Sequence, residues 1–98
     1  MAIKSYKNIE TRDIAEGVTS KVAQRLLPIS LHQAARRRLA TIDAMISLAE
    51  LSIFRGWRLE MLKGDRAGQH SIRINDQYRI CFKWNEAGAE AVEIVDYH

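Results

Sequence analysis

The side chains best suited to chemistry lie in three short segments in the second half of a chain of 98 residues. They are the charged turn 60–66, the cations Arg73, Arg79 and Lys83, and the polar triplet 96–98. Cleavage of RNA needs a base for the 2′-hydroxyl, cations for the phosphorus-centred transition state and an acid for the leaving 5′-oxygen. Groups of each kind occur in these segments, although the same groups would also serve RNA binding without cleavage.

Each of these candidates also has an ordinary structural explanation. Arg73 and Lys83 alternate with apolar residues, as surface residues of a half-buried strand do. Lys63 could lie in a polar turn, and His98 is at an end of the chain, where disorder is common. His70 has neither a second His nor a Cys at ligand spacing, so we expect no metal site, and we also expect no cofactor.

The elements that must position these segments are predicted from the periodicity of the apolar residues. Residues 3–7 fit a short strand, with Ile3 on one face and Tyr6 on the other. Asn8–Glu16 fits a short helix that the following glycine ends. Residues 18–29 are ambiguous, because apolar residues at helical spacing are followed by a proline that ends any such run.

A longer amphipathic helix is predicted after the proline. Ser30 and Gln33 fit a capping box, in which two side chains satisfy free N–H groups of the first turn. Apolar residues then recur at steps of three or four, at Leu31, Ala35, Leu39, Ile42, Ile46 and Ala49. The run Arg36-Arg37-Arg38 falls mainly off this stripe, and we interpret it as a solvated face or a partner contact.

From Trp57 onward the apolar residues alternate with polar ones, which is typical of strands. Four strands and two turns are predicted, the strands over 57–62, 71–75, 78–84 and 91–95 and the turns at 75–77 and 86–88. The order of the elements predicts an α+β fold, with a short N-terminal strand and two helices packed on a twisted antiparallel sheet. The length predicts a single domain over residues 1–98.

Charge is distributed unevenly along the chain. The net charge of +3 divides into zero over residues 1–16, +7 over 17–85 and −4 over 86–98. A basic middle favours a polyanionic partner, such as a phosphate backbone. The chain has no apolar run of membrane-spanning length and no signal-peptide pattern, and Cys81 is its one cysteine. We therefore expect a cytoplasmic protein without membrane contact.

The second half of the chain resembles the HigB branch of the RelE-like toxins of bacterial type II toxin–antitoxin systems. The resemblance rests on Gly56–Arg66 with its Lys-Gly-Asp turn, on Ser71–Ile80 and on Asp96-Tyr97-His98. Residues 35–44 add to it, whereas residues 1–34 agree mainly in length and in the order of elements. The resemblance implies a RelE-like fold and a ribosome-dependent endoribonuclease, or mRNA interferase, which cuts translated messenger RNA and thereby inhibits translation and growth.

The resemblance also implies a partner and a set of site residues. The partner is a HigA-like helix-turn-helix antitoxin, and the toxin would contact operator DNA only through it. Five residues match positions that matter for cleavage in the family, namely Lys63, Arg79, Asp96, Tyr97 and His98. Five more are assigned to RNA binding, namely Arg58, Arg66, Arg73, Gln77 and Lys83.

One position departs from the common pattern of the branch. Many HigB toxins have a histidine where this chain has Glu60, although a sub-branch resembling the GraT toxin also carries glutamate there. Either Glu60 or His98 would accept the 2′-proton, while Lys63 and Arg79 stabilise the transition state. Tyr97 would position or stack a base, and Asp96 would orient its neighbours.

Two other functions remain open at this level. A ParE-like member of the same fold would poison DNA gyrase and leave RNA uncut. A basic module without catalysis would bind ribosomal RNA and slow translation or ribosome maturation. Binding that survives the loss of the side chains of Glu60, Lys63 and His98 would favour this module.

Overall fold

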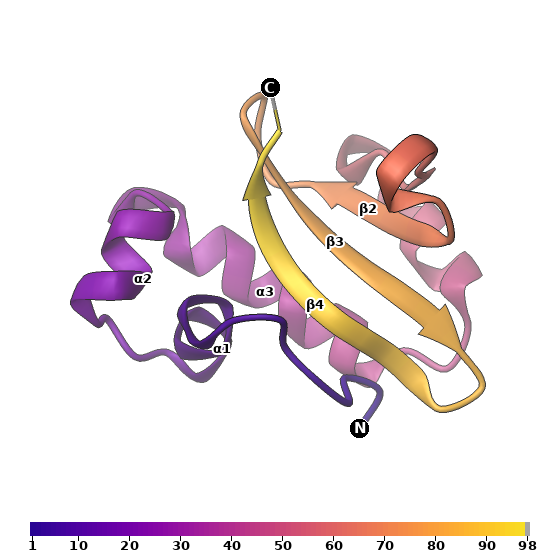
Figure 1. Ribbon diagram of the computed structural model, residues 1–98, viewed down its shortest axis with the longest axis horizontal. Helices are drawn as coiled ribbons and strands as arrows, with labels where there is room; N and C mark the ends of the chain where they lie inside the picture. The colour runs from indigo at the N-terminus through magenta and orange to yellow at the C-terminus, as the bar shows by residue number, and fades with distance from the viewer. Residues whose placement is uncertain (98) are drawn as a thin grey trace.

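The computed structural model of the chain describes residues 1–97 (Figure 1). Its first two helices are short, and a side chain caps the start of each. Asn8 caps helix α1 (Ile9–Glu16) by accepting a hydrogen bond from the Thr11 amide at 3.0 Å, and Gly17 ends it in the left-handed region at φ 78°. This confirms the helix predicted over Asn8–Glu16. The ambiguous segment that follows contains helix α2 (Lys21–Leu26), which Ser20 caps and which ends before the proline.

Helix α3 (His32–Ala44) buries the predicted apolar stripe, but it is shorter than predicted. Its start is also different, because the 3₁₀ helix η1 (Ile29–Leu31) precedes it and no side chain caps it. The predicted capping box at Ser30 is therefore wrong. A capping box lies instead at Ser47 and Glu50, where the Glu50 carboxylate accepts two backbone N–H groups at 2.7 Å and starts the 3₁₀ helix η2 (Leu48–Ile53). This competing start ends α3 early and leaves Ile46 91% exposed.

The predicted antiparallel meander is confirmed. Its four strands lie in the order β1-β2-β3-β4, with β1 at Glu60–Met61, β2 at Gln69–Arg73, β3 at Tyr78–Asn85 and β4 at Gly88–Asp96. The strand predicted over 57–62 is mostly wrong, since only two of its residues pair. The 3₁₀ helix η3 (Arg55–Trp57) includes the first residue of the predicted strand. Arg58 then adopts a left-handed conformation at φ 48°, which interrupts the extended backbone that the predicted alternation of side chains requires.

The N-terminal residues lie along β4 without forming the predicted strand. Ile3 and Tyr6 make two isolated parallel bridges, to Ala89 and Val92, and both side chains pack against the core. The predicted split of these two side chains between opposite faces is therefore wrong. Backbone hydrogen bonds of 2.7 Å join Ala2 and Lys4 to Ala89, so this segment is held tightly at the edge of the sheet.

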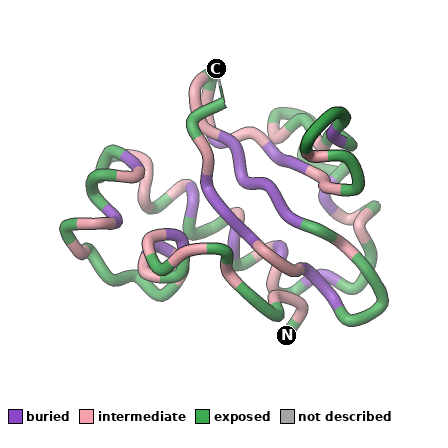
Figure 2. Tube along the Cα trace, in the orientation of Figure 1, coloured by how far each residue is buried: buried purple, intermediate pink, exposed green. Residues whose placement is uncertain are grey.

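The α-helices pack on one face of the sheet, and the other face carries no α-helix among the described residues. Apolar side chains of β2, β3 and β4 form a core with the helices, with α3 behind the sheet in Figure 1 and the buried residues following the strands in Figure 2. The predicted α+β arrangement, with helices on one face, is confirmed. In the described part of the chain no helix is long and apolar enough to cross a membrane. The opposite face, here called the open face, carries Glu60, Ser71, Arg73, Arg79, Cys81, Lys83 and Glu93.

Cys81 gives a simple check on the packing of the open face. Its thiol is fully buried opposite Glu93, and burial raises the pKa of the thiol although the nearby Arg66 charge acts in the opposite direction. Because the thiolate is the reactive form, we expect the native protein to resist a thiol reagent at pH 8 and to react promptly in guanidinium chloride. Fast labelling of natively folded protein, monitored by circular dichroism, would contradict the packing described.

Candidate active site

A cleft of about 380 Å³ lies on the open face, near the turn between β2 and β3. Three parts of the chain form its walls: the segment that enters β1, the end of β2 with the following turn, and the residues that follow β4. The lining residues are Arg58, Glu60, Arg73, Asn75, Asp76, Arg79 and Tyr97. Because these segments are far apart in sequence, the antiparallel register of the sheet is what brings them together.

Arg79 is the most fixed of the cleft residues, with only 8% of its surface exposed. Its Nε donates to Ser71 Oγ at 2.8 Å, and its Nη2 donates to the Arg58 carbonyl at 2.6 Å. The Tyr97 ring lies 5.7 Å from the guanidinium carbon, and a Glu60 oxygen lies 3.9 Å from Nη2. A cation held in this way is preorganised to receive an anion without reorganisation.

A second cation lies directly opposite the first. Arg73 pairs with Arg79 across the antiparallel strands, an arrangement of like charges that is unfavourable by itself. Two carboxylates offset it, since Asp76 forms an ion pair with Arg73 and Glu60 lies beside Arg79. The Arg73 carbonyl also accepts a hydrogen bond of 2.9 Å from Arg38 Nε of α3. The cleft therefore combines the fixed Arg79 and a second cation, Arg73, with two carboxylates that pair with them.

The end of the sheet holds Tyr97 at the edge of the cleft. Gln77 Nε2 donates to Asp96 Oδ2 at 2.9 Å, and the Tyr97 amide donates to the Gln77 carbonyl at 2.7 Å. Tyr97 itself is 43% exposed, so its ring can cover Arg79 and still contact a ligand. Gln77 therefore connects Asp96 with the backbone of Tyr97, and the orienting role of Asp96 stays a prediction.

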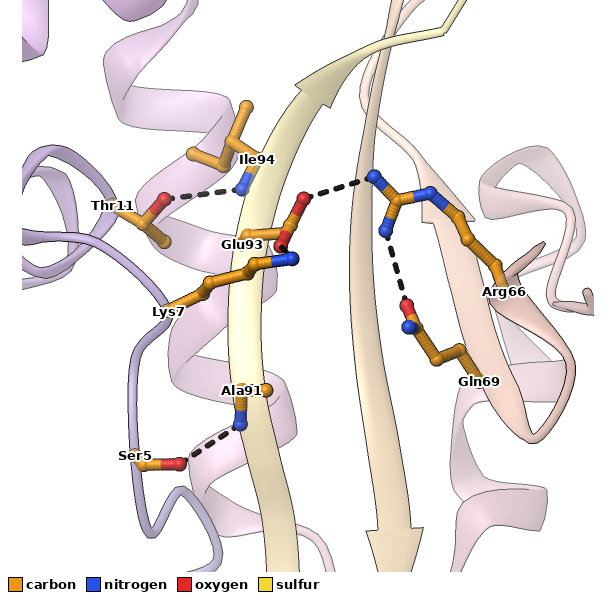
Figure 3. A network of polar contacts seen from close by, with 8 residues as sticks. All are labelled: Ser5, Lys7, Thr11, Arg66, Gln69, Ala91, Glu93 and Ile94. Atoms are coloured by element: carbon orange, nitrogen blue, oxygen red, sulfur yellow. Dashed lines mark hydrogen bonds and ion pairs between the residues drawn. The ribbon is translucent and has the colours of Figure 1, made fainter.

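A polar network farther along the open face holds the turn that contains Arg66 against β4 (Figure 3). The nearly buried Glu93 carboxylate pairs with Lys7 at 3.2 Å and with Arg66 at 3.0 Å, and Arg66 also donates to Gln69 at 3.1 Å. Burial lowers the pKa of Arg66, but the hydrogen bond and charge of Glu93 outweigh this and raise it. Arg66 ends the 3₁₀ helix η4 (Gly64–Arg66), so its main contact in the structure holds the turn that follows Lys63.

The structure brings together part of the predicted site. Glu60, Arg79 and Tyr97 line the cleft with Arg58 and Arg73, and the pair Gln77 and Asp96 lies at its edge. Three predicted residues do not line it: Lys63 is exposed at the start of η4, Arg66 is held by Glu93 and Gln69, and Lys83 is exposed farther along β3. The prediction on His98 lies outside the described residues.

Three residues of the cleft region were missed by sequence reasoning. Asn75 and Asp76 were assigned only to a turn, although their polar side chains follow directly after Arg73. Ser71, which fixes Arg79, alternates with Arg73 along β2 and so had to share its face. The alternation was the available signal, but nothing in the sequence reveals which arginine the hydroxyl meets.

Comparison with known proteins connects the chain to a family. A family model described as "RelE-like toxin of type II toxin-antitoxin system HigB" matches residues 10–98. The protein Endoribonuclease HigB of Proteus vulgaris is 34% identical over 97 residues, which cover 98% of this chain and 99% of that protein. Toxin HigB-1 of Vibrio cholerae serotype O1 is 43% identical over 60 residues, and that match spans 61% of this chain and 63% of the relative.

A solved structure supports the fold. The YoeB–YefM complex from Staphylococcus aureus contains a chain that matches with a TM-score of 0.60 at 15% identity, over 100% of this chain and 99% of that one. At this identity the similarity concerns the arrangement of helices and sheet alone. It agrees with the α+β fold predicted from the sequence.

Proposed function

This chain belongs to the HigB-like family of RelE-like toxins of type II toxin–antitoxin systems, and from this we propose that it is an endoribonuclease that cleaves translated messenger RNA on the ribosome. The observation that carries the proposal is the buried Arg79, fixed in a cleft of about 380 Å³ beside an exposed carboxylate, a second arginine and an aromatic ring. The carboxylate can act as a base and the arginines can stabilise the transition state, which are two of the functions that cleavage of a phosphodiester by its own 2′-hydroxyl requires.

The proposed reaction is an internal displacement at phosphorus. Glu60, whose side chain is half exposed in the cleft, accepts the 2′-hydroxyl proton while the 2′-oxygen forms a bond to phosphorus. The bond from phosphorus to the 5′-oxygen breaks, and that oxygen takes a proton from solvent. The products are a 2′,3′-cyclic phosphate and a 5′-hydroxyl, so atoms and charge balance without a cofactor.

The cations act on the charge that develops during this step. Arg79 and Arg73 face the same cleft and stabilise the non-bridging oxygens of the phosphorus-centred transition state. Tyr97 stacks on a base beside the scissile phosphate. Lys63 lies outside the cleft lining, and we assign it a contact with the RNA backbone as the strand leaves the cleft.

An open cleft whose two arginines already face the carboxylates Asp76 and Glu60 would hold free RNA poorly. We propose that the ribosome supplies the missing positioning, since a fixed near-attack geometry contributes much of the rate in such reactions. The family has an antitoxin partner. We propose that this partner is a HigA-like helix-turn-helix protein, that operator DNA is bound through it alone, and that the toxin acts in the cytoplasm.

Primer extension on a defined messenger RNA tests the proposal. We expect wild-type protein to produce new cuts within the ribosomal decoding site when programmed ribosomes are present, and to produce none on the same RNA alone. Equal cutting of free RNA would overturn the ribosome dependence. No cutting in either sample, together with inhibition of gyrase supercoiling, would favour the ParE-like alternative, and ribosome binding without cutting would favour the non-catalytic module.

A further inference from the structure

We propose that Phe54, stacked on Trp57, is a second RNA-binding site, on which the base of a nucleotide next to the cleft stacks. The inference rests on the proposed function, because it requires an RNA strand with its scissile phosphate in the cleft. The ligand is therefore a single-stranded part of the messenger RNA, bound through the face of one base.

The first argument is the geometry of the aromatic stack. The rings of Phe54 and Trp57 lie 4.0 Å apart between centroids, with only 11° between their planes. The guanidinium carbon of Arg38 lies 4.9 Å from the Trp57 ring. Trp57 is half-buried and packs against the core, so it fixes the orientation of the ring stacked on it.

The second argument is the exposure of Phe54. It is 40% exposed although one face of its ring is covered by Trp57, so the exposed surface lies on the other face and the edge. A rigid aromatic ring with a free face is the kind of platform on which unpaired bases stack in proteins that bind single strands.

The third argument is the charge around this platform. Residues 51–59 include Arg55 and Arg58 and no acidic residue. Both arginines are exposed, and the nearest acid before them, Glu50, is engaged with the backbone of Ile46 and Ser47. An apolar ring with exposed arginines close by in the sequence suits a nucleotide, because the base stacks on an aromatic ring and the phosphate pairs with a cation.

The fourth argument is continuity with the cleft. Arg58 lines the cleft and is four residues from Phe54, which places their Cα atoms at most about 14 Å apart. Arg38, whose guanidinium lies on the Trp57 ring, also donates to the backbone carbonyl of Arg73 in the cleft wall. A strand with one phosphate at Arg79 can therefore pass Arg58 and place a nearby nucleotide on Phe54.

Fluorescent messenger RNA on ribosomes tests this site independently of cleavage. The RNA carries 2-aminopurine at successive positions near the decoding site and a 2′-deoxy nucleotide at the scissile position, so it is bound but not cut. We expect wild-type protein to quench one position that adjoins the scissile nucleotide. Phe54→Ala should lose this quench and raise the half-saturating protein concentration about tenfold, whereas Phe54→Trp should retain both.

Ile53→Ala is the matched control, because Ile53 lies next to Phe54, is 75% exposed and has no aromatic face. We expect it to behave as wild type, with all variants showing the same thermal unfolding. Quenching that is absent, or that Phe54→Ala leaves unchanged, would overturn the inference, as would a Phe54→Ala defect confined to antitoxin binding. Cleavage of all-ribose RNA is measured separately, so cutting without the quench defeats only this inference, and quenching without cutting defeats only the proposed activity.

Discussion

Replacing Arg79 by alanine is expected to lower the single-turnover rate of messenger RNA cleavage on programmed ribosomes by about 10²- to 10³-fold. The reason is that Arg79 is the one cleft cation with its guanidinium fixed from two sides, by Ser71 and by the Arg58 carbonyl. It therefore faces the developing charge without first having to be ordered. Cleavage is measured by primer extension or by gel analysis of end-labelled RNA at saturating toxin.

Two further variants show whether the loss comes from the site. Arg79→Lys keeps the charge but loses the planar fork of donors, so we expect an intermediate rate. Lys83→Ala removes an exposed cation from the same strand and the same face, outside the cleft, and should change the rate by less than about threefold. A rate for Arg79→Lys equal to that of wild type, or equal losses in Arg79→Ala and Lys83→Ala, would show that general basicity matters and that the fixed cation does not.

Gly88→Ala is expected to lower the free energy of unfolding by about 3 kcal/mol. Gly88 begins β4 with a φ of 131°, a conformation that alanine rarely adopts. A Cβ atom placed on it would lie 2.1 Å from the Ala2 carbonyl oxygen, which accepts a hydrogen bond from Ala89. The substitution must therefore strain the strand, displace the N-terminal segment, or both. Urea unfolding followed by circular dichroism measures the change.

Gly56→Ala is the matched control for this substitution. Gly56 has no left-handed φ, and a Cβ atom there would meet nothing within 4 Å. We expect its free energy of unfolding to stay within about 1 kcal/mol of wild type, with a small gain possible because alanine restricts the unfolded chain. Similar stability of the two variants would mean that the N-terminal segment is not held against the start of β4.

The parts of the fold that were predicted correctly are those in which one local signal has no competitor. Asn8 and Gly17 define α1 from both ends, and the alternation from Ile80 to Trp84 places β3 and its core face. The errors arose where two local signals compete. The apolar stripe of α3 continues to Ala49 in the sequence, but the capping box at Ser47 ends the helix by offering the backbone another partner.

The site could be predicted only in its composition and in part of its placement. Alternation alone puts Arg73 and Arg79 on one face, but their direct pairing depends on the register between β2 and β3. The burial of Arg79 depends on Arg58, which precedes the edge strand β1, and on Tyr97, which follows the opposite edge strand β4. The tie between Arg66 and Glu93 spans 27 residues, and no local pattern predicts a contact of that kind.

The pairing of the N-terminal segment with β4 fixes the order in which this protein can be completed. Residues 2–7 leave the ribosome first, yet their partners Ala89 and Val92 are synthesised near the end, so the segment stays unpaired during most of translation. The cleft likewise needs Tyr97 to cover Arg79. A nascent chain thus lacks a finished cleft until residue 97 has left the exit tunnel. The topology of the fold therefore delays the completion of the site until almost all of the described chain has been synthesised.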